Sequence, residues 1–390
     1  MPLKLITAGE SHGPALLAIL EGMPAGLPLP NQVIDRQLER RQHGFGAGPR
    51  MQIEQDTARI LGGVMAGQTT GAPLALLLEN RDHAKWRGKA VKPLTTPRPG
   101  HADLTGALKY GYRDLRLSLE RASARETAAR VAAGAVCKHF LAQFDIQVGG
   151  YVAAIGETEA ALDDMPYEQR FTQAEASDVR CPEPVAAEAM QKAIREIMQR
   201  RDSLGGVIEI VALGLPPGLG SYVHWERRLE ARLGAALLSV PAIKGVEVGP
   251  AFHNAHLPGT QAHDPILLQG TNLLRPTSLA GGLEGGVTTG GPLVLRAAMK
   301  PIATTLTPQQ TVDLATGEPT LTQYERSDFC PVPRAVVVLE AMVAFVLADA
   351  LLEKLGGDSL DEIRPRFTAL RRPRLSDLPM DGEEHIFWPE

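Results

Sequence analysis

The sequence contains one short pattern twice, and this internal repeat limits the folds that the chain can adopt. Residues 60–76 (ILGGVMAGQTTGAPLAL) and 279–295 (LAGGLEGGVTTGGPLVL) are identical at 9 of 17 positions. Two further matches precede them in the same order, between residues 10–27 and 202–219 and between residues 35–41 and 226–232. Three ordered matches indicate duplicated halves. We place these halves at approximately residues 1–80 and 200–300.

Each half shows the hydrophobic pattern of a strand, a Pro-Gly turn, a helix and two further strands. This order favours antiparallel pairing over a parallel βαβ arrangement. We therefore expect an α+β fold, a β-α-β sandwich in which a helical layer lies between two antiparallel sheets related by a pseudo-twofold axis. The predicted elements are a strand at 15–20, a helix at 31–42 with Asn31 as N-cap and strands at 57–61 and 73–79, then a strand at 207–213, a helix at 225–238 and strands at 246–249 and 292–299.

Two segments rich in small apolar residues are expected to supply the helical layer. One begins at Ser123, which with Glu126 fits a capping box. The other, 334–354, is apolar on nearly all sides but carries Glu340, which is costly in lipid, so we expect a buried helix. We expect a single domain over residues 1–390 with a peripheral tail at 356–390.

Composition excludes several classes of protein. With 44% apolar and 22% charged residues the chain can bury a core, and its net charge of −5 argues against a general nucleic-acid or membrane binder. Its three cysteines form no Cys-x-x-Cys pair, which argues against a disulfide framework or a metal site and favours a cytoplasmic location. The basic residues are 30 Arg and 10 Lys, a ratio that suits phosphate and carboxylate recognition.

Two segments present a histidine that could transfer a proton. Gly9-Glu-Ser-His-Gly13 holds His12 between small residues, and His101 follows a turn beside Arg98 and Asp103, which could orient its ring. Each segment alone is also typical of a solvated loop histidine.

Two further segments gather charge ahead of predicted helices. At 121–127, Arg121 and Arg125 flank a helix N-terminus and form a candidate anion site. At 325–334, an unpaired base at Asp328 could lie between Arg326 and Arg334. The structural alternatives are an ordinary capped helix and a salt-bridged helix entry.

Taken in order, these motifs resemble the chorismate synthase family over about residues 5–355. Asp202-Ser-Leu-Gly-Gly206, Lys244-Gly-Val-Glu247 and Gly281-Gly-Leu-Glu-Gly-Gly286 complete the set. The resemblance implies a lyase of the shikimate pathway and aromatic amino acid biosynthesis. It would remove phosphate and the C-6 proR hydrogen from 5-enolpyruvylshikimate 3-phosphate by anti-1,4-elimination to give chorismate. Reduced FMN, no net redox change and a homotetramer are also implied.

The resemblance also implies roles for individual residues. His12 would protonate the departing phosphate, His101 would protonate or hydrogen-bond reduced flavin, and Asp328 would work with flavin N5 in removing the C-6 proton. The implied substrate-binding residues are Ser11, Arg41, Arg50, Arg98, Arg125, Arg326 and Arg334. The implied cofactor-binding residues are Arg121, Ala122, Ser123, Pro241, Ala242, Gly286, Lys300, Pro301, Ile302, Ala303, Thr304 and Arg326.

One departure and two alternatives stay open. Ala47 stands where the family pattern Gly-x-Gly-Arg-Gly has an arginine, so one substrate or pyridine-nucleotide contact is in doubt, and Arg50 or another cation could replace it. An NADPH-dependent flavin oxidoreductase is the alternative enzyme, although no Gly-x-Gly-x-x-Gly follows a strand. The second alternative is a protein without enzymatic activity that binds a phosphate ligand, which would need only the basic side chains. Whether NADPH reduces flavin here or a separate flavin reductase does so is also left open.

The repeat sets Leu204 of the second half at the position of His12 in the first. We expect one half to keep the proton donor and the other to keep only the turn.

Overall fold

The computed structural model describes residues 2–46, 55–324 and 327–388 and has the mixed α/β content predicted from the sequence. A four-stranded sheet in the first half has the order β1 (Lys4–Ala8), β2 (Ala15–Glu21), β6 (Leu74–Glu79) and β3 (Arg59–Gly62). All of its pairs are antiparallel. Leu16, Ala18 and Leu20 alternate along β2 and are fully buried, as a strand with one face on the core requires.

The second sheet has five strands and is also antiparallel throughout. Its order is β10 (Ile243–Val248), β15 (Leu293–Met299), β9 (Gly206–Leu213), β7 (Gln147–Ile155) and β8 (Thr158–Glu159). Matching β10, β15, β9 and β7 with β3, β6, β2 and β1 gives the same strand order in both sheets.

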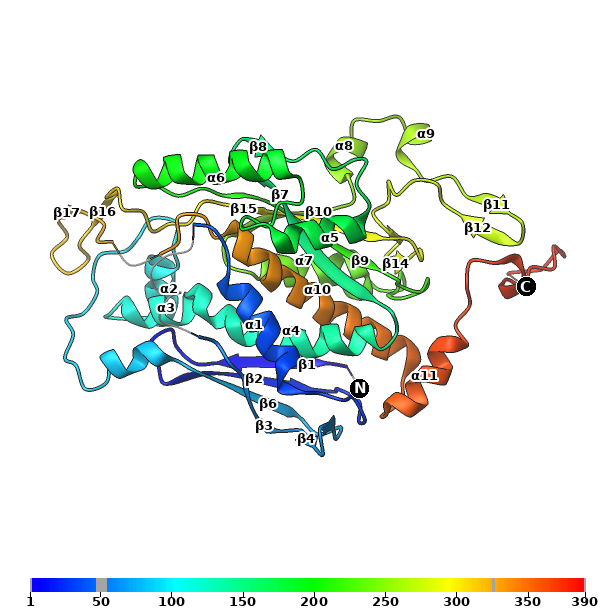
Figure 1. Cartoon of the computed structure of the whole chain (residues 1–390), viewed down its shortest axis with the longest axis horizontal. Coiled ribbons are helices and arrows are strands. Elements are labelled where there is room, and N and C mark those ends of the chain that lie inside the picture. Colours follow the sequence, from blue (N-terminus) through cyan, green and yellow to red (C-terminus); the bar gives the residue numbers. More distant parts are fainter. Residues whose placement is uncertain (1, 47–54, 325–326, 389–390) are drawn as a thin grey trace.

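Helices α4 (Thr127–Ala142), α7 (Leu229–Leu238) and α10 (Val332–Leu355) pack on these sheets, and α1 (Asn31–Gln42) packs on α4 and α10 (Figure 1). Helix α4 contacts β2 and β6 of one sheet and β7 of the other, and α10 contacts β7 and β9. Gly134 of α4 faces Ala341 of α10, where an added Cβ would lie 2.3 Å from the alanine Cβ. The absence of a side chain at Gly134 therefore sets the spacing of α4 and α10.

By length and hydropathy α10 could cross a membrane, but 89% of its most apolar window is buried inside the protein. It is a core helix, as the sequence predicted.

The remaining elements lie mostly at the periphery (Figure 1). In the first half and the connection they are β4 (Val64–Met65), β5 (Gln68–Thr69), η2 (Arg81–Lys85), α2 (Asp103–Tyr110), α3 (Arg116–Ala122), η3 (Ala124–Glu126), α5 (Tyr167–Ala176) and α6 (Pro184–Gln199). Later elements are η4 (Trp225–Arg227), α8 (Ala251–Asn254), α9 (Gly259–Ala262), β11 (Leu267–Gln269), β12 (Asn272–Leu274), β13 (Leu283–Glu284), β14 (Val287–Thr288), β16 (Gln310–Val312), β17 (Pro319–Leu321), α11 (Leu360–Thr368) and η5 (Leu375–Asp377).

The C-terminal segment is packed at its start and exposed at its end. Ala25 pairs with Ser359, and Leu360 and Ile363 of α11 are buried, whereas residues 380–388 are exposed.

The two repeated segments form the same hydrogen bonds. Thr69 Oγ1 accepts from Leu27 N at 2.9 Å and donates to Pro24 O at 2.6 Å. Thr288 Oγ1 accepts from Leu219 N at 2.9 Å and donates to Pro216 O at 2.7 Å. Each threonine thus ties its short hairpin to the Pro-Gly turn that follows the aligned strand.

Three local predictions about helix starts are wrong. The helix expected at 225–238 begins at Leu229 as α7, after the separate 3₁₀ turn η4. The N-cap of α1 is Pro30, and Asn31 is the first helical residue, with its Nδ2 donating to Asp35 and to Ala58 O. Ser123 caps the 3₁₀ turn η3 by accepting from Arg125 N, and Glu126 pairs instead with Arg130 at 2.8 Å. The extra turn before α4 displaces Glu126 from the N3 position that a capping box needs.

A buried charge cluster joins three helices of the core. Glu340 of α10 is fully buried, 2.7 Å from Arg40 of α1 and 2.5 Å from Lys138 of α4. Burial alone would raise the Glu340 pKa, but the two cations outweigh it and lower the pKa to about 2. The carboxylate is therefore charged at neutral pH and holds α1, α4 and α10 together.

Glu340→Gln should cost about 3–5 kcal/mol of unfolding free energy, because Lys138 loses its paired carboxylate in the core while Arg40 keeps only Glu175. Urea unfolding measures this loss. Glu353→Gln is the matched control on α10, since Glu353 pairs with Arg227 and Arg232 at the surface and should cost less than about 1 kcal/mol. Equal losses in the two variants would contradict a stabilising core cluster.

The advantage of wild type over Glu340→Gln should also depend on pH. The Glu340 pKa is lowered on folding, so its contribution is complete above the ordinary value of 4.5 and is lost as pH falls toward about 2. Urea midpoints of both proteins between these pH values test this. A difference that stays constant across this range would contradict the assignment.

Candidate functional site

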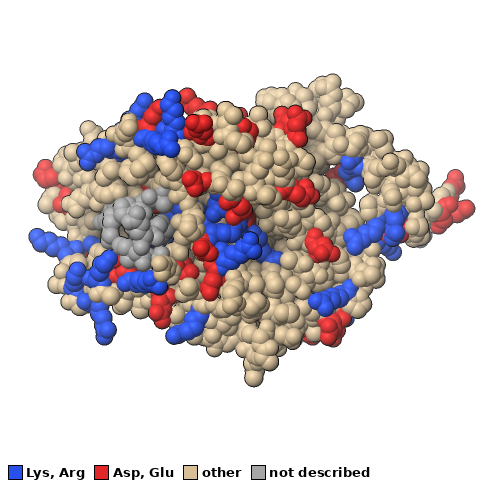
Figure 2. Space-filling model, in the orientation of Figure 1, with Lys and Arg blue, Asp and Glu red and all other residues tan. Residues whose placement is uncertain are grey.

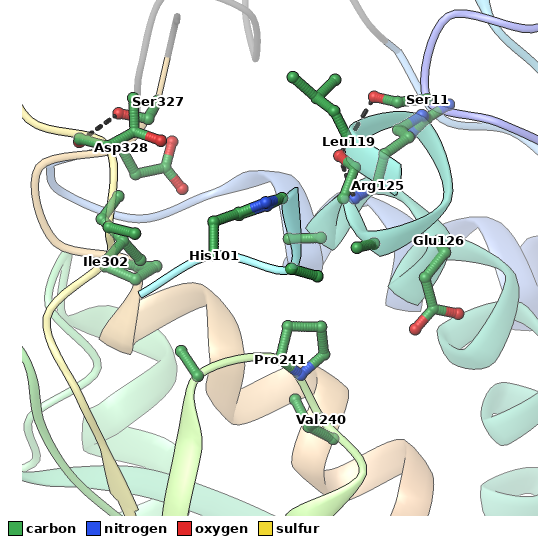
Figure 3. Close-up of a pocket in the computed structure, with 18 of the residues that line it drawn as sticks. Ser11, His101, Leu119, Arg125, Glu126, Val240, Pro241, Ile302, Ser327 and Asp328 are labelled. Carbon is green, nitrogen blue, oxygen red and sulfur yellow. Dashed lines mark hydrogen bonds between the residues drawn. The ribbon is translucent and has the colours of Figure 1, made fainter. Parts of the chain in front are cut away.

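A cavity of about 710 Å³ opens where the starts of α4 and α10 meet the end of α7. Figure 3 shows His101 between Asp328 on one side and Ser11 and Arg125 on the other, above Pro241. Residues from both halves of the chain line this cavity. Its volume suits a ligand of cofactor size.

His12 is held in the first loop by α3 and η2. Its Nδ1 lies 2.7 Å from Glu120 Oε1, and its backbone N–H donates to Glu120 Oε2 at 2.7 Å. The His83 ring hydrogen-bonds His12 O at 2.9 Å, and the Trp86 ring centroid lies 4.7 Å from that of His12. The ring is 16% exposed and borders the cavity.

His101 is held in a similar way by Asp103, as the sequence predicted. Its Nδ1 lies 2.6 Å from Asp103 Oδ1, and Arg98 donates from Nε to Asp103 Oδ2 at 2.8 Å. Burial raises the Asp103 pKa, but the hydrogen bonds from His101 and Arg98 outweigh it and the pKa is lowered. Arg98 Nη1 also donates to Thr304 Oγ1 at 3.1 Å and fixes the loop opposite.

Arg41 and Arg125 share one buried carboxylate, Asp56. Arg125 Nη1 lies 2.6 and 2.7 Å from the two Asp56 oxygens, while Arg41 Nη1 is 3.5 Å away. Burial lowers the Arg41 pKa to about 9, and the charges of Arg334 and Arg125 act in the same direction. Burial and neighbouring cations disfavour the charged form of Arg41, and an anion that binds beside it would stabilise that form.

Asp328 is ion-paired with Arg334, so the expectation of an unpaired base is wrong. Arg334 lies in the first turn of α10 and also donates to Arg41 O at 3.1 Å. The salt-bridged helix entry, the structural alternative, is therefore what the structure contains at this position. Asp328 still borders the cavity.

Most of the predicted site residues lie around this one cavity. They are Ser11, His12, Arg41, Arg98, His101, Arg121, Ala122, Ser123, Arg125, Pro241, Ala242, Lys300, Ile302, Ala303, Thr304, Asp328 and Arg334. Ala47, Arg50 and Arg326 lie outside the described residues.

Gly286 and Pro301 do not line the cavity. Gly286 lies in the turn between β13 and β14, where its N–H donates to Glu230 Oε1 and it packs on Arg228. Pro301 follows Lys300, which does line the cavity.

Several lining or supporting residues were not predicted individually. Trp86, Arg130 and Lys244 border the cavity, and Glu120 and Asp56 hold functional side chains from behind. Of these residues, only Lys244 could have been identified from the sequence, because it begins one of the motifs shared with the family.

The residues that the sequence repeat aligns with Ser11 and His12 are Ser203 and Leu204, which lie outside the cavity lining. Ser203 Oγ donates to Ile302 O at 2.9 Å, and Leu204 N donates to Phe329 O at 2.9 Å. These two residues therefore fix the loops that carry Ile302 and Asp328.

Cations dominate the charge of the cavity. Of the described residues, eight lining side chains are basic and two are acidic. Elsewhere basic and acidic side chains lie next to one another on the face in Figure 2. Lys300 illustrates the local excess, since burial and then the Lys244 charge lower its pKa. The basic residues are Arg41, Arg98, Arg121, Arg125, Arg130, Lys244, Lys300 and Arg334, and the acidic residues are Glu126 and Asp328.

Inorganic phosphate should bind this cavity and stabilise the fold, because eight basic groups face two carboxylates. At 100 times its dissociation constant it would add about 2.7 kcal/mol, measured as a rise in Tm. Arg334→Met should reduce this rise, whereas Arg275→Met, at a surface pair with Glu284, should keep it. An equal rise with chloride at matched ionic strength would contradict a phosphate site.

Comparison with known proteins agrees with the motifs. A sequence model of the family described as chorismate synthase matches residues 3–352. Chorismate synthase of Trichlorobacter lovleyi is 54% identical over 379 residues, covering 93% of this chain and 97% of that protein. Chorismate synthase of Aquifex aeolicus is 50% identical over 383 residues, covering 94% and 96%. A crystal structure of chorismate synthase superposes with a TM-score of 0.78 at 44% identity, covering 94% of this chain and 97% of that one. The chain belongs to the chorismate synthase family and, like its relatives, is a lyase.

Proposed function

We propose that the protein converts 5-enolpyruvylshikimate 3-phosphate to chorismate by anti-1,4-elimination of the phosphate and the C-6 proR hydrogen, with reduced FMN and no net redox change. The observation that carries this proposal is a single cavity that combines eight basic side chains with two histidines, each held through Nδ1 by a carboxylate. Binding an anion requires the cations alone, whereas proton transfer at two places accounts for the two held histidines.

The arginines would hold the substrate through its phosphate and two carboxylates. Guanidinium groups bind such anions in a planar, bidentate manner, and fixed cations in a partly buried cavity need little reorganisation during the reaction. Arg98 and Arg334 are each anchored by a carboxylate, Asp103 or Asp328. We assign substrate binding to Ser11, Arg41, Arg98, Arg125 and Arg334, together with Arg50 and Arg326.

His12 would donate a proton to the departing phosphate. It follows Ser11 in the chain and lines the same cavity as Arg125, where an anion attracted by the arginines would come within its reach. His101 would supply a proton or a hydrogen bond on the cofactor side of the cavity. Asp328 would take up the proton lost from C-6.

The residues present fit a flavin mononucleotide. Pro241, Ala242, Ile302 and Ala303 offer an apolar surface for a flat ring, while Lys300 and Arg121 offer charge for its phosphate. Ala122, Ser123 and Thr304 also line the cavity, and we assign them to the cofactor site. Pro301 and Gly286 do not line the cavity, and we assign them to this site from the family resemblance alone. When bound, reduced FMN would supply the electron-rich ring that the elimination needs. NADPH is the proposed source of its electrons, directly or through a separate flavin reductase.

We further propose that the fold is a duplicated β-α-β sandwich forming one domain over residues 1–390; of the tail expected at 356–390, the start packs on the core through Leu360 and Ile363, and the end is peripheral. The equal strand orders and the matching threonine hydrogen bonds support duplication. A continuous buried core from Leu3 to Ile363 supports one domain. A homotetramer and a cytoplasmic location are also proposed; the three free, buried cysteines agree with a reducing compartment.

The reaction can be tested under anaerobic conditions with chemically reduced FMN. Phosphate and chorismate should then appear in equal amounts from 5-enolpyruvylshikimate 3-phosphate, and oxidised FMN alone should give neither. Appearance of neither product with reduced FMN would overturn the proposal. An aerobic assay with FMN and NADPH shows whether this chain reduces its own flavin.

His12→Ala and His101→Ala should each lower kcat by about 10²- to 10⁴-fold, the usual contribution of a general acid. Both rings lie at the cavity rather than in the core, so circular dichroism should stay native. Retention of full turnover by either variant would remove that histidine from the mechanism.

A further inference from the structure

Glu120 contacts His12 through both of its carboxylate oxygens. Oε1 is bound to the ring Nδ1 and Oε2 to the backbone N–H, each at 2.7 Å. Glu120 O also accepts from Ser11 N at 3.1 Å. One residue at the end of α3 therefore fixes the backbone and the ring of His12 together.

The charge state of Glu120 determines which ring nitrogen carries the catalytic proton. Burial raises the Glu120 pKa, but hydrogen bonds from the His12 ring and backbone outweigh it, and the pKa is lowered. An ionised carboxylate only accepts hydrogen bonds, so Nδ1 must be the donor. In the doubly protonated ring, Nε2 is then the nitrogen left to donate to a substrate.

Other charged groups lie around His12, but none of those described takes the place of Glu120 at the ring. Asp82 of η2 is fully buried with Oδ2 4.0 Å from Nε2, beyond hydrogen-bond distance, and Lys85 lies 2.9 Å from its other oxygen. Arg116 of α3 acts on Glu120, and His83 of η2 binds the His12 carbonyl. Glu10 in the same loop is exposed. Among the groups described here, Glu120 is thus the carboxylate in direct contact with the ring.

We propose that Glu120 is the positioning residue of the phosphate-leaving step: it fixes His12 through Nδ1 and the backbone, presents Nε2 to the substrate and places a negative charge beside the ring that donates the proton. This inference rests on the proposed function. Geometry and charge are both required. A glutamine at this position would keep a hydrogen-bond acceptor of the same shape but lose the negative charge that favours the imidazolium.

Glu120→Gln should lower kcat by about ten- to hundredfold and change KM for 5-enolpyruvylshikimate 3-phosphate less than about twofold, because Glu120 lies outside the cavity lining. The alkaline limb of the kcat profile should move to lower pH. Glu120→Asp, which keeps the charge, should restore part of the rate. Glu353→Gln, which removes an ion-pairing carboxylate far from the cavity, should behave as wild type.

A second readout does not depend on turnover. Diethyl pyrocarbonate reacts with neutral imidazole, and peptide mass spectrometry reports its addition to each histidine. In Glu120→Gln the onset of His12 modification should move to lower pH, while His101, which is held by Asp103, should not change.

The two readouts separate failure of this inference from failure of the proposed function. An unchanged pH profile and unchanged His12 modification in Glu120→Gln would overturn the positioning role. A loss of rate that comes only with a loss of native circular dichroism would also overturn it. If His12→Ala instead keeps full turnover, the assignment of His12 as the acid fails, whatever Glu120 does to the ring.

Discussion

The close approach of α4 and α10 is the constraint on which the rest of the structure depends. Gly134 leaves room for Ala341, and the two helices pack together between strands of both sheets. Both helices also begin at the cavity, because Arg125 precedes α4 by two residues and Arg334 lies in the first turn of α10. The positive ends of two helix dipoles are thereby directed at the place where an anion would bind.

The same packing separates two electrostatic environments. Deep in the helical layer, each cation has a carboxylate partner: Glu340 pairs with Arg40 and Lys138, and Glu175 pairs with Arg40 and Arg180. At the cavity the balance is reversed: carboxylates such as Asp56 lie behind the cations, and cationic groups face the open space. A chain with a net negative charge can therefore contain a strongly positive site. The sign of the site depends on whether the cation or the carboxylate of each ion pair faces the cavity.

Many of the strands and helices could be predicted from the hydrophobic pattern of the sequence. Elements and side-chain partners that depend on contacts between distant residues could not. Strand β2 and helix α10 were predictable because alternation and continuous apolarity are local signals. Strand β7 was not predicted, since Gly149 and Gly150 weaken its pattern and only the packing of Phe171 explains Gly149. The histidines and arginines of the cavity were recognisable from motifs. Their partners were not, because Asp56 and Glu120 resemble ordinary surface carboxylates until the fold brings them to Arg125 and His12.

The two aligned turns differ in their relation to the cavity: His12 borders it, whereas Leu204 lies outside its lining. The first carries a titratable ring, and the second fixes the carbonyls of Ile302 and Phe329 through Ser203 and Leu204. If the halves share an ancestor, as proposed, a homodimer of half-chains would have carried two identical turns and could not have specialised either. Fusion into one chain removes that symmetry, so one turn can change for chemistry while the other is retained as a support.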